Sequence, residues 1–89
     1  MTGAFGADLH HVLTRGAGGS DHPKNLMPLR HELHEEVGMI GMVRFAQKYS
    51  LAKFWLLENG WEWSSQLCTW FAPPEAREPL KKIMPRKLI

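Results

Sequence analysis

Residues 10–34 read HHVLTRGAGGSDHPKNLMPLRHELH, and the elements around them can be predicted by starting from this stretch. Residues 7–14 mix apolar, β-branched and imidazole side chains in a short run, which predicts a strand. The nine residues after Arg15 include three glycines and a proline. This composition is typical of a loop, so the strand is expected to lead into an irregular connection.

The rest of the chain is divided by recognisable helix ends. Gly38 and the pair Asn59-Gly60 are stop signals, and Ser50 is a suitable N-cap. The last segment is expected to be extended or to form a hairpin around 64–65, so the fold class is α+β. The predicted elements are extended segments over 25–27 and 61–71 and helices over 29–37, 39–49 and 51–58.

Composition limits the class of protein. A chain of 89 residues with 44% hydrophobic residues is sufficient for one domain. It has neither an apolar run long enough to span a membrane nor a secretory signal pattern, so we expect a cytoplasmic protein with no membrane partner. The single cysteine, Cys68, excludes an internal disulfide and a cysteine zinc site. Any metal must be bound by other side chains, and all five histidines lie within 25 positions, with His10, His11, His31 and His34 as the cluster of interest.

The positive net charge comes from the C-terminal residues. Residues 1–74 carry six Lys or Arg against seven acidic residues, whereas residues 75–89 carry five against two. We therefore predict a domain over 1–74 and a basic, proline-containing tail over 75–89. The tail is a candidate for contacting a polyanion, with Lys81 and Lys82 as candidate nucleic-acid-binding residues.

The alternation of side chains on a strand separates the adjacent histidines. Asp8 and His10 would share one face, while His11 would point to the other. One imidazole could then bind a metal together with the helical His34, while the other faces a scissile phosphate. Phosphodiester hydrolysis needs a general base and a cation that neutralises charge on the phosphate, so these residue types fit that reaction.

The order of adjacent histidines, glycine-rich loop, Asn25-Leu26 and helical histidine resembles the HNH nuclease family, in particular its small phage and prophage members. The resemblance rests on residues 10–34, is supported more weakly by FAQKYSLAKFWLLENGWEW at 45–63, and covers about residues 8–63. It implies a ββα-metal (His-Me finger) core extended by C-terminal helices. It also implies a phage or prophage endonuclease that cleaves DNA in the bacterial host with one divalent ion (Mg, Mn, Ni or Zn).

The resemblance also assigns roles to individual residues. His10 and His34 would bind the metal, and His11 would be the general base. Asn25 would orient the base by bonding the backbone of the loop that follows His11. The alternative for Asn25 is an ordinary Asx turn ahead of Pro28.

The chain departs from the family at two places. Many relatives have a second helical histidine where this chain has Gly38, and relatives often carry cysteines that bind a structural zinc at Arg30 and Leu33. Asp8 and His31 are candidate additional ligands, and water or a substrate phosphate oxygen could also fill the gap. For His31 we favour a solvated histidine on an acidic helix.

Nucleic-acid contacts are expected mainly from the loop. Arg15 with its neighbouring glycines resembles the loop that approaches the phosphate backbone in relatives, and a flexible linker with an incidental charge is the alternative. Lys24 is a weaker candidate. The four tryptophans are better explained by core packing than by base stacking, and Trp61 and Trp63 would share a face on a strand.

A second hypothesis comes from another class of protein. The missing ligand at Gly38 would fit a catalytically silent HNH-fold protein that binds DNA or a protein partner. A purely structural metal domain is disfavoured, because a closed tetrahedral site does not need two adjacent histidines and an asparagine. The expected partners are DNA and, in addition, phage packaging proteins or a second copy of the chain.

Overall fold

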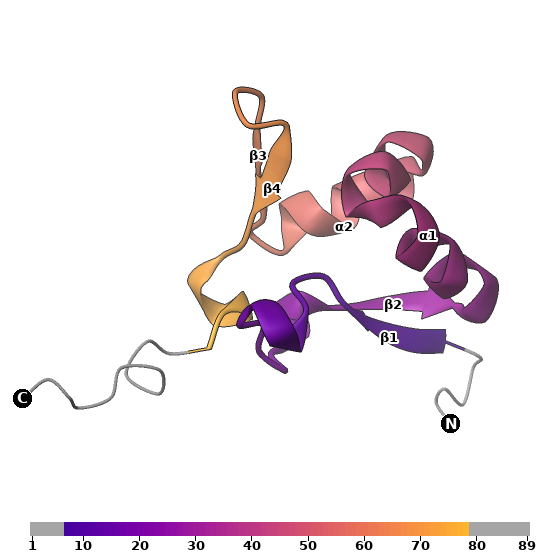
Figure 1. Cartoon of the computed structure of the whole chain (residues 1–89), viewed down its shortest axis with the longest axis horizontal. Helices are drawn as coiled ribbons and strands as arrows, with labels where there is room; N and C mark the ends of the chain where they lie inside the picture. Colours follow the sequence, from indigo (N-terminus) through magenta and orange to yellow (C-terminus); the bar gives the residue numbers. More distant parts are fainter. Residues whose placement is uncertain (1–6, 79–89) are drawn as a thin grey trace, which may run out of the picture.

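The computed structural model describes residues 7–78, which form a small α+β domain with two helices and two small antiparallel sheets (Figure 1). The α+β prediction is confirmed at this level. Short 3-10 turns connect the elements at η1 (Arg15–Ala17), η2 (Pro23–Asn25) and η3 (Pro74–Ala76). The regular elements are β1 (Ala7–His11), β2 (Leu26–Arg30), α1 (His31–Lys48), α2 (Ser50–Glu58), β3 (Glu62–Ser64) and β4 (Thr69–Phe71).

Strands β1 and β2 pair antiparallel, with Asp8 opposite Leu29 and His10 opposite Met27. Residues that are directly opposite in such a pair point to the same face. Met27 and Leu29 are buried in the core, and α1 packs on this sheet, so Asp8 and His10 face the helix. His11 points to the other face. The strand itself ends at His11, three residues before the predicted end.

Helix α1 begins at His31 and continues through Gly38, so the prediction that a helix stops at Gly38 is wrong. The break is at Gly41, whose φ of 85° and ψ of 159° lie in a region that glycine alone adopts readily. Two helical segments therefore follow β2, as predicted. The break between them is at Gly41, three residues after the predicted break at Gly38. Gly38 keeps helical geometry, and a Cβ there would meet nothing within 4 Å.

Helix α2 confirms the helix predicted over 51–58. Ser50 is its first residue and not its cap; Tyr49 occupies the N-cap position and makes no side-chain capping bond. Gly60 follows the helix with a φ of 87°, as its stop signal predicts. The expected hairpin is formed by β3 and β4, with Trp63 opposite Trp70.

The core lies between β2, α1 and α2, and its largest fully buried apolar side chains are Phe45, Met27 and Leu56. Trp61 is also buried, but Trp63 is 41% exposed, so the two do not share a core face. Trp61 lies just before β3, where the chain leaves α2, and its indole Nε1 donates to the Lys24 carbonyl at 2.8 Å.

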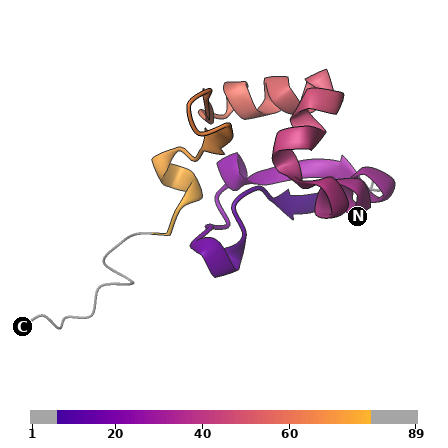
Figure 2. The same cartoon turned by 45° about the horizontal axis from the view of Figure 1, so that its top comes forward.

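The described fold continues past Pro74. Ala76 is completely buried, and Ser20 N donates to its carbonyl at 2.9 Å. The N–H of Glu78 donates to the Gly18 carbonyl at 2.8 Å, so the segment around η3 is fastened to the loop after β1 (Figure 2). The predicted boundary at 74/75 thus falls within packed structure. Lys81 and Lys82 lie outside the described residues, and no helix within 7–78 is long and apolar enough to cross a membrane.

Candidate active site

One group of candidate residues lies where β1 meets the start of α1. The Asp8 carboxylate is 3.0 Å from His31 Nδ1 and 3.1 Å from His34 Nδ1, both through Oδ2. These two hydrogen bonds hold the pKa of Asp8 below its ordinary value, and the bond with His31 has the larger effect. The bond to Asp8 and the nearby Glu35 carboxylate raise the pKa of His31. His31 is exposed on α1, and its ring contacts both Asp8 on the strand and Glu35 on its own helix.

His10 lies beside the same group. Its ring and that of His34 are arranged edge to face, with centroids 5.3 Å apart. Burial lowers the pKa of His10, and the nearby His34 and His11 imidazoles lower it further. A neutral imidazole is the form that binds metals, so the environment of His10 suits a ligand.

The chemistry of these donors fits a divalent ion only in part. Two imidazoles bound to one tetrahedral ion through nitrogens about 2.1 Å from it have ring centres about 5 Å apart, close to the separation of His10 and His34. Within residues 7–78, however, no group of three or more His, Cys, Asp or Glu side chains is arranged to hold a metal. The Nδ1 atoms of His31 and His34 are both engaged by the same Asp8 oxygen, Oδ2.

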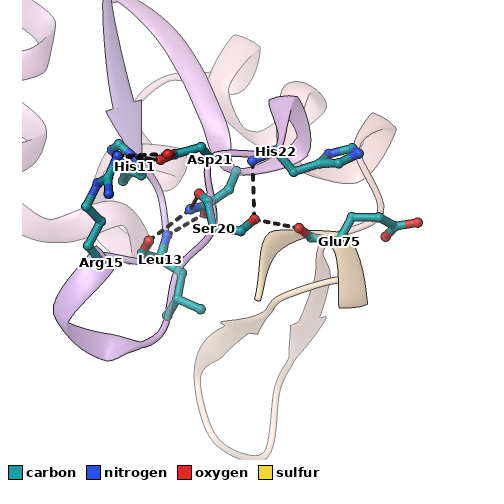
Figure 3. A network of polar contacts seen from close by, with 8 residues as sticks. His11, Leu13, Arg15, Ser20, Asp21, His22 and Glu75 are labelled. Atoms are coloured by element: carbon teal, nitrogen blue, oxygen red, sulfur yellow. Dashed lines mark hydrogen bonds and ion pairs between the residues drawn. The ribbon is translucent and has the colours of Figure 1, made fainter. Parts of the chain in front are cut away.

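A second group lies on the opposite face of β1. His11 Nε2 is 2.8 Å from Asp21 Oδ1, and Arg15 Nη2 donates to both Asp21 oxygens at 2.8 Å (Figure 3). The hydrogen bond from His11 is the main cause that lowers the pKa of Asp21, and the Arg15 charge adds to it. Sequence reasoning assigned no role to Asp21. A loop acidic residue ten positions after a histidine carries no periodic signal, and the loop fold alone brings the two together.

Asn25 is completely buried at the end of η2, directly before β2. Its Oδ1 accepts from Leu13 N at 2.7 Å, and its Nδ2 donates to the carbonyls of Leu13 and Ser20 at 2.9 and 2.8 Å. The Asx-turn alternative is therefore wrong, because the side chain bonds residues far before it. Asn25 fixes the backbone on both sides of the loop that carries Asp21, while its side chain is bonded to main-chain atoms and not to the His11 ring.

Two of the loop glycines have structural reasons that the sequence interpretation did not include. Gly18 has a φ of 91°. A Cβ on Gly19 would lie 1.8 Å from the Leu13 carbonyl oxygen. Only Gly16 has open space and an ordinary φ, so the run of glycines is explained largely by the loop's own fold.

Two of the four predicted nucleic-acid-binding residues lie in the described part of the chain, and both are bonded within the domain. Arg15 is exposed but bonded to Asp21, and Lys24 Nζ is 3.3 Å from a Glu75 oxygen. Gly38 lies on the exposed surface of α1, and a side chain there would meet nothing within 4 Å. The position at which the resemblance to the HNH family implies a further ligand is therefore open helix surface.

Comparisons with known proteins give no match: no family model, no curated protein and no solved structure is similar to this chain.

Proposed function

We propose that the chain is a metal-dependent endonuclease of the HNH type, with a ββα-metal core made by β1, β2 and α1. The observation that carries the proposal is that the adjacent histidines His10 and His11 lie on opposite faces of β1. His10 faces α1 with its ring centroid 5.3 Å from that of His34, whereas His11 lies on the opposite face and is held by a carboxylate. In this proposal the ion would lie on the face of His10 and His34, and the base would act from the face of His11.

His10 and His34 would hold the ion. Asp8 would be the third donor, after giving up its hydrogen bonds to the His31 and His34 rings in favour of the ion. When bound, the ion would neutralise charge on the phosphate and the leaving oxygen. His11 would accept a proton from the attacking water. Asn25 would keep the loop after His11 in one conformation, so its role is to position the backbone and not to touch the substrate.

The substrate proposed is DNA in the bacterial host. Contacts from Lys24 and the basic residues of the tail would be to phosphates, which carry little base information, so sequence specificity would be low. A protein of this size that cuts one strand would need a second copy or a phage packaging partner to cut two.

The test is plasmid nicking with Mg²⁺, Mn²⁺, Ni²⁺ or Zn²⁺ as the added ion. We expect cleavage with at least one ion, and a loss of on the order of 100-fold or more in rate for His11→Ala, in line with general-base catalysis. His22→Ala is the matched control, because His22 lies in the same loop and caps η2 through Lys24 N. Absence of cleavage with every ion, or equal rates for wild type and His11→Ala, would reject catalysis.

A catalytically silent DNA-binding or partner-binding protein is the second candidate. It is favoured by the open surface at Gly38 and by the absence of a three-donor metal group within the described residues. Calorimetric titration with the same ions separates the two. The nuclease hypothesis expects binding that weakens at least tenfold in His34→Ala, while the silent protein binds no ion and its folding is indifferent to that change.

A further inference from the structure

We propose that Asp21 is a positioning residue that fixes the His11 imidazole with its proton on Nε2 and its free lone pair on Nδ1. The inference deepens the proposed function and rests on His11 as the base. The ionised carboxylate of Asp21 can only accept hydrogen bonds. Its oxygen lies 2.8 Å from His11 Nε2, so Nε2 must carry the hydrogen. In the neutral ring, Nδ1 is then the nitrogen that can take a proton.

Asp21 is itself held in place, which is what a positioning residue requires. Arg15 Nη2 contacts both carboxylate oxygens at 2.8 Å. The residues on either side are fastened: Ser20 Oγ donates to the Glu75 carbonyl at 2.6 Å and accepts from His22 N at 3.2 Å (Figure 3). The Ser20 carbonyl accepts from the buried Asn25. The backbone on either side of Asp21 is therefore fixed, and a rotation of the carboxylate away from His11 would also change its two contacts with Arg15.

The second consequence concerns Arg15, which the sequence suggested as a phosphate contact. Arg15 Nη2 donates to the Asp21 carboxylate, and this carboxylate in turn bonds His11 Nε2. The guanidinium of Arg15, the carboxylate of Asp21 and the imidazole of His11 are thus connected in series by hydrogen bonds. Arg15 is thus assigned to the orientation of the base.

In the reaction, a water proton would move to His11 Nδ1 while the electron pair of the broken O–H bond stays on oxygen. That oxygen forms the new bond to phosphorus. The bond between phosphorus and the leaving oxygen breaks, and the leaving oxygen takes its electron pair and then a proton from solvent. The imidazolium keeps its Nε2–H directed at Asp21, whose negative charge offsets the charge that has formed.

The first experiment reads the tautomer directly and needs no catalysis. Long-range ¹H–¹⁵N correlation spectra at alkaline pH distinguish a neutral ring protonated on Nε2 from one protonated on Nδ1, and the His11→Gln spectrum assigns the signals. We expect the Nε2–H form in the wild type. In Asp21→Asn the amide can either donate or accept, so both tautomers should appear. Glu58→Gln, which makes the same chemical change at the end of α2, should leave the spectrum unchanged.

The second experiment measures cleavage by the same variants. Asp21→Asn should lower kcat by on the order of 10- to 100-fold, the range typical when the outer partner of a functional imidazole is lost, with KM nearly unchanged. Arg15→Gln should have a smaller effect in the same direction, and far-ultraviolet circular dichroism checks that each variant is folded. An unchanged tautomer in Asp21→Asn overturns the proposal. A shifted tautomer in a chain that never cleaves DNA supports the assignment of Asp21 and rejects the nuclease function.

Discussion

The side chain of Asn25 bonds both main-chain groups of Leu13, twelve residues earlier, accepting from its N–H and donating to its carbonyl. A third bond reaches the Ser20 carbonyl. Asn25 thereby satisfies partly buried backbone groups at both ends of the loop between β1 and η2. Few single side chains can do so, because the amide alone offers an acceptor and two donors within one planar group.

Replacing Asn25 by alanine should lower the free energy of unfolding by about 3 kcal/mol, because three hydrogen bonds of a buried side chain are lost and their backbone partners stay partly buried. Urea denaturation monitored by tryptophan fluorescence measures the change. Asn59→Ala is the matched control: Asn59 makes one side-chain bond, to the Trp55 carbonyl, and should lose only about 1 kcal/mol. Equal losses in the two variants would show that Asn25 is not an anchor of the loop.

The two glycines of α1 should respond to alanine with opposite signs. Gly41→Ala should destabilise the fold by about 1–3 kcal/mol, since the φ of 85° strains any L-residue. Gly38→Ala should stabilise it by about 0.5–1 kcal/mol, because Gly38 lies within the helix and its Cβ would meet nothing. Thermal unfolding of the two variants beside the wild type tests the pair. If Gly38→Ala were the more harmful, the helix break would be at Gly38 after all.

Local patterns were sufficient to predict much of the fold. The run of mixed side chains at 7–14 and the stop signal at Gly60 each depend on neighbours in sequence, and both elements are present. The choice between Gly38 and Gly41 was beyond such reasoning. Either glycine can end a helix, and packing of the second helical segment, with Phe45 buried, determines which one does.

The candidate site was predictable to a smaller extent. Strand alternation correctly separates His10 from His11, and helix periodicity brings His31 and His34 to Asp8. Asp21 was missed because its contact depends on the path of an irregular loop. The contribution of the η3 segment was missed for a similar reason: prolines and basic residues indicated a tail, but Ala76 is buried against the domain.

Acid should weaken the attachment of η3 to the loop. The pKa of Glu75 is lowered mainly by a hydrogen bond from the residue's own main-chain N–H, and further by the bond from Lys24. A carboxyl with a lowered pKa in the folded state adds stability above its unfolded pKa and loses it as the pH falls through the folded value. The wild type should therefore be more stable than Glu75→Gln at neutral pH, and this difference should disappear in acid. Chemical denaturation at a series of pH values tests it, with Glu58→Gln as the matched change elsewhere. A difference that persists at the lowest pH would contradict the role of the charge.

At Gly19 the backbone passes close to Leu13. A Cβ there would lie 1.8 Å from the Leu13 carbonyl oxygen and 2.6 Å from its carbon, and both are backbone atoms that cannot rotate away. Gly19→Ala should therefore displace the loop and cost about 1–3 kcal/mol or more. Gly16→Ala, three residues earlier and with nothing within 4 Å, should stay within about 0.5 kcal/mol of the wild type.

Hydrogen exchange locates the effect of Gly19→Ala. The Gly19 amide donates to the Thr14 carbonyl and the Glu78 amide donates to the Gly18 carbonyl, so both should lose protection in Gly19→Ala and keep it in Gly16→Ala. Because Asp21 is two residues further along, the same displacement should separate it from His11 and reduce cleavage. Protection that survives in Gly19→Ala would mean that the loop has another conformation of similar stability, and the contacts made by Asp21 would then not be fixed by the fold.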